Sequence, residues 1–242
     1  MATYVSLVNE LLRRLNEVTL DTEGDGFDSV RNVQALAKDS INNSIRSILQ
    51  TGQEWPFLRT TYTQPLTAGV STYSFPSDYS SVDWETFFLK KSSSLGNSPS
   101  FLPAIAYDEY IQKYRVSDDS ASASGVSAPN FVYQTNEEKF GVTPLPDSAY
   151  EVEYSYWSFP NDLTNYDDVV IIPNRFKSVV VDGAMMYMMR FRSNEQSASI
   201  HQQNFEEGIK TMRRVLIDEP LQVRSTVLSG SSGSSVTLGR VT

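Results

Sequence analysis

The chain contains one histidine, His201, and no cysteine, so the side chains that most often carry catalysis are nearly absent. A serine–histidine–aspartate triad would have to use His201, yet no Gly-x-Ser-x-Gly motif accompanies it. His201 falls on the apolar stripe of a predicted helix, which favours a packed or interface role. A zinc site needs several cysteine or histidine ligands, and neither a P-loop nor a Gly-x-Gly-x-x-Gly motif is present. The sequence therefore predicts no enzyme and no cofactor.

The acidic segment DTEGDGFDSVRN, residues 21–32, partly imitates a calcium-binding loop. Asp21, Glu23 and Asp25 stand at alternate positions before a glycine, as in such loops. The twelfth position is Asn32 instead of the glutamate that binds the ion through both oxygens. The favoured interpretation is a solvated acidic turn that caps the next helix, and cation binding stays open.

Two carboxylates, Glu151 and Glu153, lie on one face of a predicted strand, about 7 Å apart by strand geometry. Glycosidases place their carboxylates at similar separations. However, any alternating acidic strand produces this spacing. A solvated strand face is therefore preferred, and a hydrolase that uses these residues remains an alternative.

The whole chain has 13 tyrosines and 3 tryptophans, and these aromatic residues are concentrated in its middle part. Aromatic rings on a β-sandwich can bind sugars, but they more often form the core or a subunit interface. A carbohydrate- or receptor-binding module is kept as the second function.

The net charge of −9 is unevenly distributed. Residues 57–160 hold twelve acids and six bases, residues 1–56 hold eight and five, and residues 161–242 hold nine of each. An acidic middle is unsuited to gripping nucleic acid, which needs clustered Lys and Arg. It does suit a wall along which DNA slides without adhering.

Apolar residues recur at helical spacing at both ends of the chain. The apolar stripe of the first helix consists of Val5, Val8, Leu11, Leu15 and Val18. The second helix is about 22 residues long and follows a cap at Asp28 or Ser29. Its stripe consists of Val33, Leu36, Ile41, Ile45 and Ile48. The third begins at Pro173 with Phe176, Val179, Gly183 and Met186, and the fourth carries Ala198, His201, Phe205, Ile209, Met212 and Leu216. A glycine in mid-helix costs about 1 kcal/mol relative to alanine, so we expect another backbone to approach Gly183 closely.

Between residues 57 and 160 the apolar period changes to two. Strands are predicted at 72–75, 84–91, 130–135, 139–142 and 150–157, with a short helix at 107–114 and a flexible loop at 117–128. The segments EWPF and WSFP mark the two crossings between the helices and this region.

These patterns predict an α+β protein. A four-helix bundle is expected from residues 1–56 and 161–218, with an antiparallel β-rich domain inserted at 57–160 and an extended C-terminal tail at 219–242. No apolar run approaches the roughly 20 residues needed to span a bilayer, and the N-terminus lacks signal-peptide features. Synthesis in the cytoplasm and no membrane contact are expected.

The chain resembles the head-to-tail adaptor proteins of tailed bacteriophages, including the tail tubular protein A group. The resemblance rests on this layout and on three segments, SLVNELLRRLNEV, EWPFLR and IIPNRFKSVVVDGAMMYMM. The resemblance spans residues 4–217. It implies a structural virion protein at the head–tail junction. It also implies a ring, usually a dodecamer, that binds the portal protein, carries the downstream nozzle or tail tube, and extends the DNA channel.

In the C-terminal tail of the chain, residues 219–242, apolar and polar residues alternate as in a strand that has no sheet of its own. We expect it to contact the portal or a neighbouring subunit, because ordering such a segment costs about 1–2 kcal/mol per residue unless a partner compensates. The expected contact residues are Leu221, Val223, Val227, Leu228, Val236, Leu238 and Val241.

Overall fold

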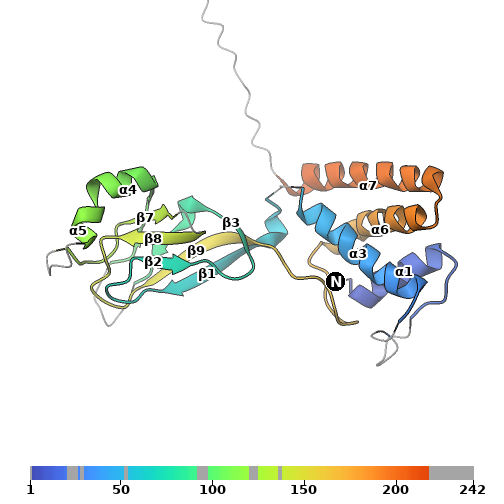
Figure 1. Cartoon of the computed structure of the whole chain (residues 1–242), viewed down its shortest axis with the longest axis horizontal. Helices are drawn as coiled ribbons and strands as arrows, with labels where there is room; N and C mark the ends of the chain where they lie inside the picture. Colours follow the sequence, from blue (N-terminus) through green and yellow to red (C-terminus); the bar gives the residue numbers. More distant parts are fainter. Residues whose placement is uncertain are drawn as a thin grey trace, which may run out of the picture.

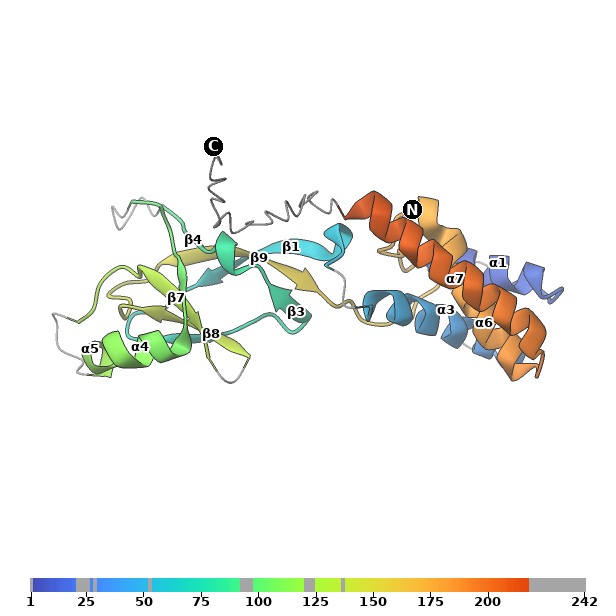
Figure 2. The same cartoon turned by 90° about the horizontal axis from the view of Figure 1, so that it is seen from above.

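The computed structural model describes residues 2–20, 27, 30–51, 54–91, 98–119, 125–135 and 138–217. It confirms an α+β protein with α-helices and two β-sheets. Figures 1 and 2 show two lobes end to end, which we call the helical lobe and the β lobe. The helical lobe contains the helices α1, α3, α6 and α7, and the β lobe contains both sheets with α4 and α5.

Four helices share one apolar core in the helical lobe. They are α1 (Tyr4–Arg14), α3 (Val33–Leu49), α6 (Lys177–Phe191) and α7 (Glu195–Leu216). α6 packs against all three others, and α1 also packs on α3. The short 3-10 helix η3 (Asn174–Phe176) leads into α6.

The predicted limits of these helices need correction. α1 ends at Arg14, so Val18 lies beyond it and is 78% exposed instead of continuing the apolar stripe. α3 has its N-cap at Asn32 and is 17 residues long, shorter than expected. Pro173 precedes η3 and does not open the α-helix itself. Hydrophobic spacing identified each helix but not the residue at which it begins or ends.

The close approach expected at Gly183 is made by side chains and not by another backbone. Ser44 of α3 and Phe205 of α7 both lie against the glycine. Because α3, α6 and α7 meet there, even a methyl group would displace one of these two side chains.

The first sheet has the order β1-β9-β4-β5, with β3 also pairing β9, and the second has the order β2-β8-β7-β6. The strands of the first sheet are β1 (Arg59–Pro65), β3 (Tyr79–Val82), β4 (Phe88–Leu89), β5 (Ser100–Phe101) and β9 (Glu151–Ser158). Those of the second are β2 (Thr72–Ser74), β6 (Ala104–Ile105), β7 (Phe131–Gln134) and β8 (Lys139–Thr143).

Three expectations for the β lobe were partly wrong. The sheets are not wholly antiparallel, because β6 and β7 run parallel. The segment 84–91 opens with the 3-10 helix η2 (Trp84–Thr86), and its strand, β4, has two residues. The short helix α4 (Tyr107–Lys113) is followed by α5 (Arg115–Asp119), which occupies the beginning of the predicted flexible loop.

The apolar core of the β lobe lies under alternate residues of β9. Val152, Tyr154 and Tyr156 are buried, whereas Glu151 on the other face is exposed. The core is rich in aromatic rings, with Phe87 stacked on Tyr154 at a centroid distance of 4.8 Å. The alternating pattern YEVEYSYW therefore marks the central strand of the first sheet.

Aromatic residues hold the two crossings between the lobes. Trp55 is fully buried in the core of the helical lobe, and its indole N–H donates a hydrogen bond of 3.2 Å to the carbonyl oxygen of Ile48. The 3-10 helix η1 (Pro56–Leu58) then leads into β1. Ser158 Oγ donates a hydrogen bond of 3.2 Å to Leu58 O, which ties the returning segment to the outgoing one. In the described part of the chain, no helix is long and apolar enough to cross a membrane.

Candidate functional site

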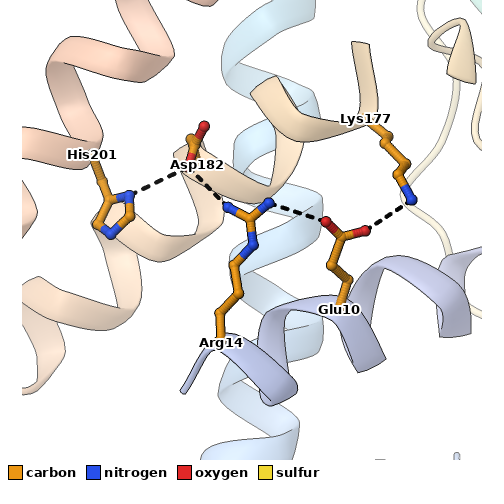
Figure 3. Close-up of polar contacts among 5 residues, drawn as sticks. All are labelled: Glu10, Arg14, Lys177, Asp182 and His201. Carbon is orange, nitrogen blue, oxygen red and sulfur yellow. Dashed lines mark hydrogen bonds and ion pairs between the residues drawn. The ribbon is translucent and has the colours of Figure 1, made fainter. Parts of the chain in front are cut away.

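Five charged or titratable side chains form a continuous series of polar contacts across the helical lobe (Figure 3). Lys177 Nζ lies 3.1 Å from one oxygen of Glu10, and the other oxygen accepts a hydrogen bond of 3.0 Å from Arg14. Arg14 also donates to Asp182 Oδ1 at 3.1 Å, and that oxygen lies 3.3 Å from His201 Nδ1. The series joins α1, α6 and α7.

This network braces the helices. Its side chains are between 20% and 49% exposed, a setting in which each ion pair contributes about 0–1 kcal/mol. Partial burial on its own would raise the pKa of Glu10, but Lys177 and Arg14 outweigh it and hold the pKa below its ordinary value. Each carboxylate is used to neutralise a neighbouring cation. The imidazole of His201 is half-buried and its contact with Asp182 joins α7 to α6.

The two strand carboxylates lie on the outer face of β9. Glu151 is exposed, and Glu153 is half-exposed and lies 3.3 Å from Lys90 Nζ. The buried residues of β9 face the opposite side. The position of both carboxylates is that of a solvated strand face.

The aromatic residues of the β lobe differ in their exposure, and Tyr107, Tyr110 and Tyr133 form a stack of their own. Most of the rings, including Phe75, Phe87, Phe140 and Tyr154, pack on one another in the core. A sugar platform cannot use these rings, because they are covered. Sequence patterns did not separate them from the exposed rings described next.

Two phenylalanines form an exposed aromatic pair on the outer face of the first sheet. Phe88 in β4 and Phe101 in β5 stand opposite each other and are 41% and 52% exposed. Phe101 also lines a shallow groove with Trp84, Pro103 and Ala104. Because Phe101 occupies a strand of two residues, no periodic signal could have identified it.

A second apolar groove lies on the helical lobe, between α3 and the segment that returns from the sheet. Its wall includes Ile45, Leu163 and Ile171. Arg46 and Asp162, which form an ion pair, also line this groove. Apolar side chains and an ion pair therefore line the same groove.

Asp118 is the one aspartate or glutamate that is buried in the described part of the chain. Burial raises the pKa of its carboxyl group. A raised pKa can mark a functional site, but Asp118 lines neither of the two grooves described above. It lies in α5 near Tyr110 and Thr143, and its Oδ2 atom has no hydrogen-bond partner among the described residues.

Two sets of predicted residues cannot be placed. The acidic loop, Asp21 to Asp28, lies outside the described residues except for Phe27, and so do all seven tail residues between Leu221 and Val241. Within the described ranges, no group of three or more His, Asp or Glu side chains could hold a metal ion.

The described residues form an α+β protein with apolar grooves and with charges that pair between helices. The SU10 adaptor protein family model matches residues 2–227, and the chain belongs to that family. The predicted resemblance to phage head-to-tail adaptors is thereby confirmed. No curated protein matches the chain.

Proposed function

We propose that this phage structural adaptor forms a ring at the head–tail junction of the virion, where it links the portal protein to the downstream tail and extends the DNA channel. The family match carries the proposal, because it spans residues 2–227 and so covers both lobes. A dodecamer, a nozzle or tail-tube partner, and a role in DNA ejection follow from the resemblance. Synthesis takes place in the host cytoplasm.

The division of labour within the subunit is part of the proposal. The helices of residues 1–56 and 161–218 act as one four-helix bundle, residues 57–160 as an inserted β-rich domain, and residues 219–242 as an extended tail. The separate apolar cores of the two lobes support this division, since each lobe buries its own side chains.

We assign binding of the portal protein to the C-terminal tail of the chain, residues 219–242. Its apolar residues Leu221, Val223, Val227, Leu228, Val236, Leu238 and Val241 form two alternating groups on either side of a Gly/Ser stretch. An extended segment of this kind binds by adding to a sheet edge or filling a groove.

DNA passes through the ring without specific binding. The excess of acids in residues 57–160 supports this, because like charge shortens the time that DNA spends near a wall. Full-length protein should show no micromolar affinity for duplex DNA at physiological salt. Replacing Glu151 and Glu153 by lysine should create affinity that falls as salt is added.

The deciding experiment mixes the full-length protein with the portal of its own phage and images the product by electron microscopy. Rings seated on the portal are expected. Absence of any portal complex, together with glycan binding by the monomer, would favour the carbohydrate- or receptor-binding alternative. That alternative is the weaker one because the aromatic rings it needs are mostly in the core.

A further inference from the structure

The strands at the edges of the two sheets differ in length. β5 and β6 have two residues each, β2 has three and β3, which pairs only with β9, has four, whereas β1 has seven. Pro99 and Pro103 flank β5. Short strands and prolines prevent an edge from pairing with another chain. β1 therefore stands out as the long and unguarded edge among the described strands.

The hydrogen bonds of the sheet show which backbone groups of β1 face outward. Leu66 N–H donates to Tyr150 O at 2.8 Å, and hydrogen-bonded pairs alternate along an antiparallel ladder. The even-numbered residues of β1 therefore bond to β9. The odd-numbered residues, which include Thr61 and Thr63, point their N–H and C=O groups away from it.

Contacts on the other side of β9 agree with this assignment. Ser155 stands opposite Thr61 in the register of the two strands. Its N–H donates to Thr86 Oγ1 at 2.9 Å, and its carbonyl oxygen accepts from Asp83 N–H at 3.0 Å. Both backbone groups of Ser155 thus point away from β1, so Thr61 has no bond to β9.

The row of β1 backbone groups that point away from β9 ends at Arg59 on one side and at Pro65 on the other. Arg59 N–H is bonded to Pro56 O, and Pro65 has no N–H to donate. The carbonyl oxygen of Pro65 accepts a hydrogen bond of 3.0 Å from the side chain of Gln64. Two outward N–H groups remain, those of Thr61 and Thr63, and they stand symmetrically about Tyr62.

We propose that β1 pairs with β1 of a second copy of this chain around a two-fold axis at Tyr62. In this antiparallel register Thr61 of each copy stands opposite Thr63 of the other, and the four N–H groups and four carbonyl oxygens form four hydrogen bonds. Arg59 stands opposite Pro65, where neither copy has an N–H group to offer. The edge is thus complementary to itself.

The side chains of β1 permit this pairing. Thr60, Thr61 and Tyr62 are exposed, and residues 60–64 carry no charge. Threonine pairs and aromatic pairs across neighbouring strands each stabilise a sheet. The ring of Tyr62, 38% exposed, packs on Tyr154 at 5.9 Å, and it would meet its symmetry mate in the close, non-hydrogen-bonded position.

The paired state goes beyond the ring assembly proposed above. A two-fold contact uses the same patch on both copies and cannot by itself close a ring built from head-to-tail contacts. Pairing therefore belongs to the free protein before it meets the portal. It would cover an edge that is otherwise open to aggregation.

Sedimentation of the full-length protein over a concentration series tests the proposal, with Thr61→Pro and Thr61→Val as the matched variants. Thr61→Pro removes an outward N–H without touching the bonds to β9, while Thr61→Val keeps the N–H and the branched side chain. Wild type and Thr61→Val should show a monomer–dimer equilibrium. Thr61→Pro should weaken it about tenfold or more, since two of four hydrogen bonds are lost. Circular dichroism verifies that the variant is folded.

Disulfide trapping provides a second readout, because the chain has no cysteine of its own. In the proposed register the two copies of residue 62 have Cα atoms about 4.5 Å apart, within the range of a disulfide. Tyr62→Cys should give a covalent dimer on oxidation. Gln64→Cys, on the same face but away from the axis, should not.

Three results would overturn the proposal. Wild type could stay monomeric at every concentration, or both cysteine variants could cross-link equally. Alternatively, the tail variant Leu221→Asp/Val223→Asp could abolish dimerisation, which would assign the edge to the tail. The portal experiment is independent of these tests, so either idea can fail while the other stands.

Discussion

Gly183 of α6 lies so close to Ser44 of α3 that a β-carbon added to it would come within 2.2 Å of Ser44 Oγ. The same β-carbon would lie 2.7 Å from Phe205 Cε2 of α7. Ser44 is itself fully buried, and its Oγ donates a hydrogen bond of 2.8 Å to Val180 O. Three helices are therefore in contact at a point where α6 has no side chain.

Gly183→Ala should lower the free energy of unfolding by about 1–3 kcal/mol, because overpacking outweighs the gain in helix propensity. Urea unfolding measures the change. In a Ser44→Ala background the same substitution should cost less, since the nearest atom has been removed. A more stable Gly183→Ala protein would mean that the helices separate at little cost.

Trp55→Ala should lower the free energy of unfolding by about 3–5 kcal/mol, since the indole is 0% exposed and stacks on Phe57 at 5.7 Å. Trp55→Phe keeps much of the buried area and loses the hydrogen bond to Ile48, so it should cost less. Thermal and urea unfolding measure both variants. Unchanged stability with lost assembly would instead place Trp55 at a subunit interface.

The substitution Glu10→Gln tests the network of Figure 3, because it should change how the free energy of unfolding depends on pH. The pKa of Glu10 is lowered in the folded protein. The carboxylate therefore stabilises the fold above the pKa of the unfolded chain, and this contribution is lost as pH falls through the folded value. Glu10→Gln should be less stable at neutral pH by up to about 1 kcal/mol, and the difference should shrink as pH falls below the ordinary glutamate pKa of about 4.3.

The matched control for this substitution is Glu207→Gln. Glu207 is an exposed carboxylate on α7 and forms no ion pair with the described residues. Removing its charge should leave stability nearly unchanged between neutral and acid pH. If both variants behaved alike, the effect would reflect net charge and not the contacts of Glu10 with Lys177 and Arg14.

Hydrophobic periodicity predicted the fold class and the position of the central strand. The alternation of Val152, Tyr154 and Tyr156 with polar residues is strong because β9 has one buried and one exposed face. The limits of the helices were less accurate, as Val18 shows, because an apolar residue can follow a helix at the expected spacing without belonging to it. Strands of two residues, such as β4 and β5, are too short to show any period.

The surface features could not be predicted in the same way. The pairing of Phe88 with Phe101 depends on the register of two very short strands, and the ion pair of Arg46 with Asp162 joins residues 116 positions apart. No spacing in the sequence records such contacts. The outward direction of Thr61 and Thr63 likewise depends on the register between β1 and β9, which the composition of β1 does not determine.

The tail gives the last prediction, which concerns portal attachment. Its apolar residues alternate with polar ones, as in a strand that completes the sheet of another protein. Truncation after Glu219 should leave the helical circular dichroism signal unchanged, because the four helices lie within residues 4–216. The truncated protein should lose stable attachment to the portal in a pull-down assay. Val223→Asp/Val227→Asp should reproduce the loss, whereas the polar-site control Gln222→Asp should not. Undiminished attachment of the truncated protein would exclude the tail as the portal contact.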